Sequence, residues 1–179
     1  QERIWNYSQT DQGVAAYTMV SRHRILGALD LDVFRECLNR LSERYELLRA
    51  TFTVSDGRPY QKINPPGKVE LSFVNLTDAT DPAAEVRKLA ERQRAQHFDL
   101  SKGPLQRFTL IKIKENEHWL LRLFHHILSD AQSRELYFEA LAELYEALVR
   151  DAGPAVSNFE PLQYADYAYW QRQSFRAET

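Results

Sequence analysis

Apolar residues between positions 31 and 48 recur every three or four positions, which is the spacing of one face of an α-helix. Asp30 or Asp32 is available to cap the first turn, because a short carboxylate accepts hydrogen bonds from the free N–H groups there. The pattern predicts an amphipathic helix over residues 31–48. Its apolar positions are Val33, Phe34, Cys37, Leu38, Leu41, Tyr45 and Leu48.

Five segments with strand-like patterns follow this helix. Residues 50–54 and 60–63 flank Asp56-Gly57, a dipeptide that favours a tight hairpin because glycine adopts positive φ. A third strand is expected over residues 69–75, where apolar and polar positions alternate. Two strongly apolar segments are joined by a short polar link and are expected to be central strands of a sheet; they span residues 105–113 and 118–124.

Three further helices are predicted. Asp81-Pro82 is a typical helix start, and the basic residues after it indicate a solvated face. Apolar spacing predicts a second helix over residues 136–148, which Gly153-Pro154 would end, and a third, aromatic helix over residues 164–175. The order of these elements predicts an α/β sandwich, with helices packed on a largely antiparallel sheet.

The composition limits the partners and the compartment. The chain has 23 basic and 25 acidic residues, so its formal net charge of -2 gives no electrostatic drive toward nucleic acid or an anionic membrane. The apolar runs are interrupted by charge within a few residues, and the first residues resemble no signal peptide. The single cysteine, Cys37, excludes an internal disulfide and a Cys/His metal cluster, and it favours a reducing, cytoplasmic setting.

Two adjacent histidines, His125 and His126, stand between the last predicted strand and a helix. Loops at strand ends are where rigid scaffolds present reactive groups, and an imidazole suits proton transfer near neutral pH. Taken alone, however, such a pair is more often a partly buried aromatic residue beside a surface polar residue, and the spacing by itself favours that interpretation. Adjacent strand residues point to opposite faces, so we expect no metal site there. A hydrolase triad of His126 and Asp130 with a nearby serine is rejected, because no Gly-x-Ser-x-Gly turn is present.

Five segments carry a further pattern. Residues 124–133 read FHHILSDAQS, residues 44–52 read RYELLRATF and residues 164–170 read YADYAYW, while Gln1, Arg3 and Trp5 stand near the start. These segments resemble motifs of the condensation domains of nonribosomal peptide synthetases, and they follow one another along the chain in the same order as those motifs. Residues 124–133 resemble the His-His-x-x-x-Asp-Gly signature. Residues 98–105, followed by Arg107, are also typical of that family. The resemblance covers essentially the whole chain.

The resemblance implies a chloramphenicol acetyltransferase-like α/β sandwich that forms one lobe of a two-lobed domain. Residues 1–179 would be the amino-terminal lobe, and the motifs of the carboxy-terminal lobe find no match after Trp170. We therefore expect an excised fragment without the second lobe, and we expect the isolated fragment to be inactive.

The implied reaction is amide bond formation between a donor acyl thioester and an acceptor aminoacyl thioester, each held on the phosphopantetheine of a carrier domain. No cofactor or metal would be bound directly, and the partners would be donor and acceptor carrier domains, the missing lobe and neighbouring synthetase domains. His126 would be the catalytic residue, either as a proton acceptor or by holding the amine and oxyanion. Asp130 would shape the loop through an ion pair with an arginine, and the partner would be Arg44, Arg49 or a residue of the missing lobe. The supporting residues would be His125, Asp130, Ala131, Arg44 and Arg49.

Departures from the family pattern keep alternatives open. Tyr45 replaces a histidine, Ala50 a threonine and Ala131 the glycine of the signature. Alanine would be strained at position 131 if the site required positive φ, whereas a helical φ would accept it. An ester-forming acyltransferase, an epimerization domain and a non-catalytic module that binds carrier or tailoring proteins remain alternatives. A heterocyclization domain is excluded, because it would carry aspartate in place of His125.

Overall fold

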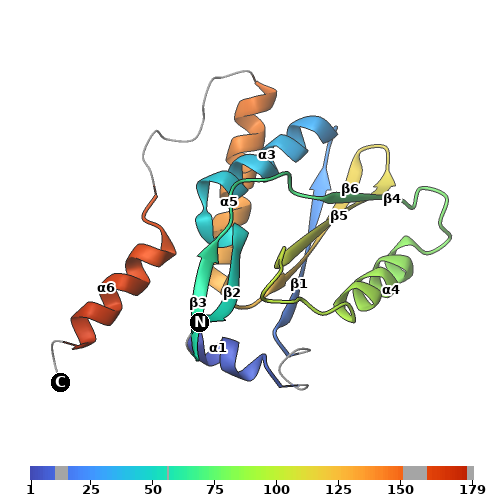
Figure 1. Ribbon diagram of the computed structural model, residues 1–179. Coiled ribbons are helices and arrows are strands. Elements are labelled where there is room, and N and C mark those ends of the chain that lie inside the picture. The colour runs from blue at the N-terminus through green and yellow to red at the C-terminus, as the bar shows by residue number, and fades with distance from the viewer. Residues whose placement is uncertain (11–15, 56, 151–160, 177–179) are drawn as a thin grey trace.

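A four-stranded mixed sheet lies at the centre of the protein, and helices cover both of its faces (Figure 1). The computed structural model describes residues 1–10, 16–55, 57–150 and 161–176. The strand order is β1 (Thr18–Leu26), β6 (Glu117–His125), β5 (Gln106–Lys114) and β4 (Leu71–Asn75). The first three strands are mutually antiparallel and β4 pairs parallel with β5, so the predicted α/β sandwich with a largely antiparallel sheet is confirmed.

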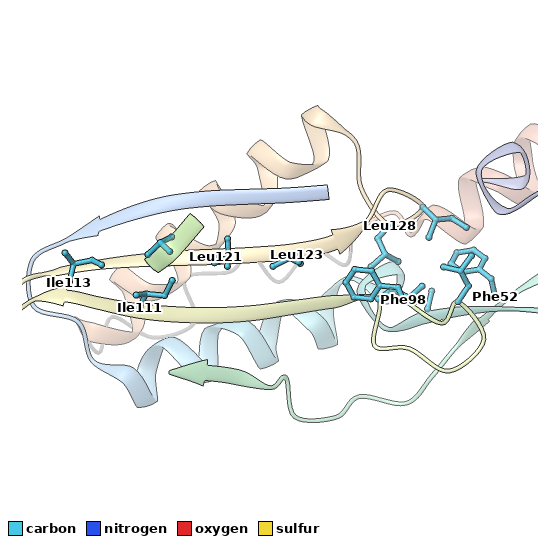
Figure 2. Packing of buried hydrophobic residues seen from close by; sticks show 12 residues of the cluster. Phe52, Phe98, Ile111, Ile113, Leu121, Leu123 and Leu128 are labelled. Atoms are coloured by element: carbon cyan, nitrogen blue, oxygen red, sulfur yellow. The ribbon is translucent and has the colours of Figure 1, made fainter. Parts of the chain in front are cut away.

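The central strands β5 and β6 bury side chains on both faces, which explains why their apolar residues are not confined to alternate positions. On one face, side chains of β5 and β6 pack together with Phe52 and Phe98, as Figure 2 shows. On the other face, Phe108, Leu110 and Leu120 contact a second cluster of buried residues. The prediction that residues 105–113 and 118–124 form central strands is confirmed.

Helix α4 (Pro82–Arg94) covers the first face, where its residue Val86 is buried. It begins as predicted, since the carboxylate of Asp81 accepts a hydrogen bond from the Ala84 N–H at 2.9 Å. The basic residues on its outer face are exposed, as expected of a solvated surface: Arg87, Arg92 and Arg94.

Helices α3 (Leu31–Arg44) and α5 (Ala131–Val149) cover the second face. Asp30 is the residue that caps α3, because its carboxylate accepts from the backbone N–H groups of Asp32 and Val33 at 2.9 and 3.0 Å. Helix α5 ends at Val149, and the predicted stop signal Gly153-Pro154 lies outside the described residues.

The prediction of one continuous helix over residues 31–48 was wrong at its end. Tyr45 is extended, with φ -106° and ψ 99°, and a separate 3₁₀ turn, η1 (Glu46–Arg49), follows it. The side chain of Gln163 holds this break from both sides: its Nε2 donates to the Arg44 carbonyl at 3.0 Å, and its Oε1 accepts from the Glu46 N–H at 3.1 Å. A side chain 117 residues away from Glu46 thus replaces helical hydrogen bonds that periodicity alone would predict.

The remaining elements flank this sandwich. The predicted hairpin is present as β2 (Ala50–Ser55) and β3 (Arg58–Ile63), with Gly57 at φ 72°, and the aromatic helix is α6 (Tyr164–Arg176). Helix α1 (Glu2–Tyr7) and the edge strand β1 were not anticipated. Among the described residues, no helix is both long enough and apolar enough to cross a membrane.

Candidate active site

The two histidines of the signature lie where β6 leaves the sheet. His125 is the last residue of the strand, and its N–H donates to the Leu105 carbonyl at 2.9 Å. The N–H of His126 donates to the Tyr17 carbonyl at 2.8 Å. Two neighbouring segments therefore fix the backbone on which both imidazoles are carried.

His125 is a buried, neutral residue. Its Nδ1 accepts a hydrogen bond from the Ile127 N–H at 3.2 Å, so the ring proton is on Nε2, which lies 3.3 Å from the Ser8 hydroxyl. Ser8 in turn donates to the Ile4 carbonyl at 2.7 Å. Burial, and secondly the neighbouring His126, lower the pKa of His125 to about 4. This imidazole therefore supports the loop and is not placed to exchange protons at neutral pH.

His126 has the opposite arrangement. Its ring is half-buried, and Nδ1 lies 2.8 Å from the Ser129 carbonyl oxygen. A carbonyl can only accept, so Nδ1 carries a proton, and in the neutral imidazole the lone pair is therefore on Nε2. Within the described part of the chain, no group is hydrogen-bonded to Nε2. The predicted catalytic residue is therefore held in the tautomer that a proton acceptor requires.

Asp130 acts as the N-cap of α5. Its carboxylate accepts hydrogen bonds from the Ser133 N–H at 2.8 Å and from the Ser133 hydroxyl at 2.6 Å, and these bonds lower the pKa of Asp130. The expected ion pair with Arg44 or Arg49 is not formed, and Asp130 has no arginine partner among the residues that the structure describes. The residue is exposed, so its charge needs no buried counter-ion.

Arg44 and Arg49 support the neighbouring turn instead. Arg49 donates to the Asn64 carbonyl at 2.7 Å and lies 3.6 Å from Glu46. The guanidinium of Arg44 lies 5.8 Å from the ring centre of Tyr45, and its carbonyl is held by Gln163. The two arginines therefore organise η1 and its surroundings rather than the histidine loop.

Ala131 is the first residue of α5 and has a helical conformation. The position therefore has the helical φ that alanine accepts without strain, and not the positive φ that would require glycine. The exposed methyl group needs no compensating change nearby.

Other nucleophiles and ligands do not assemble around the loop. The Ser133 hydroxyl donates to Asp130 and not to an imidazole, which agrees with the rejection of a hydrolase triad. Cys37 is buried in α3, and burial raises the pKa of its thiol to about 11. Among the described residues, no group of three or more His, Cys, Asp or Glu side chains could hold a metal ion.

Sequence reasoning missed several residues that hold the loop or lie beneath it. Gln1 donates from Nε2 to the Ile127 carbonyl at 3.0 Å, which explains why the first motif accompanies the histidine signature. Ser8 had no sequence signal, because its role depends on a contact with His125, 117 residues away. Arg122 is fully buried in β6, and the signal that it gave was an interruption in an otherwise apolar strand.

Phe98 and Arg107 explain the family-like stretch between α4 and β5. Arg107 donates to the carbonyls of Gln96 and His97 at 2.6 and 3.1 Å, and its guanidinium lies 4.2 Å from the ring centre of Phe98. The Phe98 ring meets His125 edge-on, with 6.5 Å between ring centres. The stretch thus packs against the histidine that supports the loop.

Comparisons with known proteins show which family this chain resembles. A family model described as "Condensation domain" matches residues 1–178. The chain is 37% identical over 180 residues to a linear gramicidin synthase of Brevibacillus parabrevis, and the match covers 99% of this chain and 4% of that protein.

Two solved structures are similar over nearly the whole chain. The first condensation domain of the calcium-dependent antibiotic synthetase, in complex with a substrate analogue, is 26% identical with a TM-score of 0.88, covering 98% of this chain and 44% of that one. The X-domain from teicoplanin biosynthesis is 32% identical with a TM-score of 0.81, covering 98% and 37% of the respective chains. The sequence match over residues 1–178, with His125 at the end of β6 and His126 on the loop that follows, shows that this chain belongs to the condensation domain family.

Proposed function

We propose that this chain is the amino-terminal lobe of a two-lobed condensation domain that forms amide bonds in nonribosomal peptide synthesis, with His126 as its catalytic residue. The similarity to a linear gramicidin synthase and to a condensation domain that is more than twice as long as this chain supports the proposal. The observation that carries it is the lone pair on Nε2 of His126, which the bond from Nδ1–H to Ser129 leaves available.

In the proposed reaction the acceptor amine nitrogen attacks the carbonyl carbon of the donor thioester. A C–N bond forms and the C–S bond breaks, so that the acyl group is transferred to the acceptor. Nε2 of His126 accepts the proton that the amine loses, and this proton then passes to the departing thiolate. The products are an amide-linked thioester on the acceptor arm and a free thiol on the donor arm.

Residues of this chain support this step by fixing the position of the His126 imidazole and the proton on its Nδ1. In the neutral imidazole Nε2 accepts the proton of the amine, and it becomes a donor to the oxyanion only after protonation. His125 cannot share this role, because its Nδ1 is occupied by the Ile127 N–H and its Nε2–H is directed to Ser8. No acyl-enzyme is required, which fits the raised pKa of the Cys37 thiol.

The proposed partners are a donor and an acceptor carrier domain, each presenting its substrate on phosphopantetheine, together with the second lobe and neighbouring synthetase domains. The proposed compartment is the cytoplasm, where the free thiol of Cys37 is compatible with a reducing environment.

The test offers one donor-loaded carrier to the full-length protein with an aminoacyl acceptor, with a hydroxyacyl acceptor, or with no acceptor. An aminoacyl acceptor should give an amide-linked product by mass spectrometry, and a hydroxyacyl acceptor should give none. Ester formation would indicate an ester-forming acyltransferase. Inversion of the donor stereocentre without an acceptor would indicate epimerization. Binding of carrier domains without any product would indicate a non-catalytic module.

A further inference from the structure

The side chain of Tyr17 lies against both histidines of the candidate active site. Its ring centre is 6.0 Å from that of His125 and 6.1 Å from that of His126. Tyr17 immediately precedes β1, whose first residue, Thr18, pairs with His125. Its carbonyl also accepts the hydrogen bond from the His126 N–H at 2.8 Å. Tyr17 therefore contacts His126 through its backbone and through its ring.

His125 is a fixed support for the Tyr17 ring. Its Nδ1 accepts from the Ile127 N–H and its Nε2 lies 3.3 Å from the Ser8 hydroxyl, so turning this imidazole would break both hydrogen bonds. The imidazole is buried, and polar groups that lose their partners inside a protein are costly. The Tyr17 ring packs against it with an interplanar angle of 55°. One neighbour of the tyrosine ring is therefore rigid.

Helix α1 supplies a second support for the same ring. The ring of Tyr7 meets Tyr17 edge-on, with an interplanar angle of 84° and 5.8 Å between ring centres. This T-shaped arrangement is one that aromatic pairs prefer. Tyr7 is the last residue of α1, and it directly precedes Ser8, which contacts His125. The end of the helix therefore contacts the tyrosine ring and the supporting histidine at the same time.

The imidazole of His126 is less constrained by its own hydrogen bonds. Nδ1 is bonded to the Ser129 carbonyl, and this bond alone leaves the plane of the ring free to tilt. The terminal torsion of a histidine is also broad, since it joins an sp³ and an sp² carbon. The Tyr17 ring meets the imidazole edge-on, with an interplanar angle of 68°. This contact restricts the tilt that the hydrogen bond permits.

We propose that Tyr17 is a positioning residue for amide formation. Its ring, held by His125 and Tyr7, restrains the imidazole of His126. In the restrained orientation Nδ1 keeps its hydrogen bond to Ser129, and Nε2 keeps one direction. The inference rests on the proposed function, because it assigns a role in the reaction of His126. Tyr17 acts through this histidine, and it exchanges no proton and contacts no substrate.

A spectroscopic test measures the imidazole of His126 independently of catalysis. The full-length protein is isotope-labelled on its histidine nitrogens, and NMR spectra at about pH 8, where a free imidazole is neutral, report which nitrogen carries the proton. The signals of His126 are those that are absent from His126→Ala. The wild-type protein should show the proton on Nδ1. In Tyr17→Leu, which has no aromatic ring, the two tautomers should interconvert and their signals should average, whereas Tyr17→Phe should retain the wild-type spectrum.

A kinetic test uses the same variants with loaded carrier domains. Tyr17→Leu should lower kcat about tenfold and leave KM for the acceptor carrier unchanged, because a misdirected base slows the chemical step and not the binding. Tyr17→Phe should have the wild-type kcat, because it keeps the ring and removes only the hydroxyl. Tyr7→Leu removes the supporting ring from α1, and it should change the spectrum and kcat in the same direction by a smaller amount.

The control is Tyr60→Leu, which removes an exposed tyrosine of β3 and should change neither the spectrum nor kcat. Tyr7→Leu replaces Tyr17→Leu if that variant does not fold, because Tyr7 is 45% exposed and its loss removes little packing. A wild-type spectrum without the Tyr17 ring, or a wild-type kcat in a protein that forms amides, overturns the inference. It is also overturned if Tyr17→Phe is as impaired as Tyr17→Leu. A changed His126 spectrum in a protein that forms no amide would instead retain the restraint on His126 and reject the proposed function.

Discussion

The carbonyl oxygen of Ser129 lies 2.8 Å from Nδ1 of His126, three residues earlier on the same loop. The backbone of the loop therefore sets the tautomer of its own histidine, in a role that a carboxylate has in many catalytic sites. No buried charge is needed for this purpose. It follows that Asp130 can cap α5, and that the proton on Nδ1 of His126 is fixed before any substrate binds.

Replacement of His126 by alanine should abolish most of the amide formation. The variant removes the proposed proton acceptor and leaves the supporting bonds of His125 in place, so the fold should be retained. We expect product formation to fall roughly 100- to 10,000-fold, the range typical of general-base catalysis. Loaded carriers and mass spectrometry of the full-length protein provide the measurement.

The matched control is His97→Ala, which removes an exposed histidine whose described hydrogen bond uses only its backbone carbonyl. Its rate of product formation should equal that of the wild-type protein. If His126→Ala were as active as this control, the assignment of His126 as the catalytic residue would have to be withdrawn.

The buried, neutral state of His125 predicts a pH dependence of stability. Because its pKa in the folded protein is about 4, against 6.5 for the free side chain, the unfolded chain binds a proton between these values and the folded chain does not. The contribution of neutral His125 to the free energy of unfolding is therefore complete above pH 6.5 and is lost as the pH falls toward 4. A difference of this size corresponds to about 3 kcal/mol in the free energy of unfolding.

Urea unfolding between about pH 4 and pH 7 measures this effect, with His125→Gln as the comparison. Burial also lowers the pKa of His23 and His118, and they contribute in both proteins, so the difference between the two curves isolates His125. The variant should be less stable than the wild-type protein at neutral pH, and its free energy of unfolding should depend less steeply on pH. Parallel curves would mean that the pKa of His125 is the same in the folded and unfolded protein.

Much of the fold was predictable because it is encoded locally. The cap at Asp81 and the apolar runs of β5 and β6 act over a few residues, and these elements formed where they were expected. The break at Tyr45 was not predictable, since Gln163 stabilises it from a distant segment. Strand β1 was also missed, because it is an edge strand whose exposed and buried positions alternate weakly.

The candidate site also has parts that could be predicted from the sequence and parts that could not. The motif resemblance led to His126, and the structure places its Nε2 without a hydrogen-bond partner in the described part of the chain. The ion pair expected for Asp130 is not formed with Arg44 or Arg49, because this carboxylate is exposed and caps α5, and a partner from the second lobe stays a prediction. Ser8 and Arg122 depend on contacts across the sheet and the loop, which a linear pattern does not encode.

Ala131→Gly would restore the glycine of the signature, and it should not increase activity. Residue 131 is already helical, so glycine offers no conformational advantage and adds backbone freedom to the unfolded chain. We expect a loss of about 0.5–1 kcal/mol in the free energy of unfolding and an unchanged rate of amide formation. A clear gain in rate would show that the methyl group narrows the path of the substrate.

Asp130→Ala should destabilise the protein by the value of a helix cap and not by that of a buried ion pair. Loss of an N-cap carboxylate costs about 1 kcal/mol, whereas breaking a buried ion pair would cost about 3–5 kcal/mol. Asp130→Asn is the matched control, because the amide oxygen can still accept from the Ser133 N–H, and it should retain most of the stability.

A double-mutant cycle with Ser133→Ala separates the two bonds that Asp130 accepts. The serine variant removes the hydroxyl at 2.6 Å and leaves the backbone N–H at 2.8 Å, so the two substitutions should be less than additive. The bonds from Ser133 lower the pKa of Asp130, and their contribution is therefore complete above the unfolded value of 3.8 and is lost as the pH falls through the lower folded value. If Asp130→Ala and Asp130→Asn were equally and severely destabilised, the charge itself would be required. An arginine from outside the described residues would then have to replace the cap as the explanation.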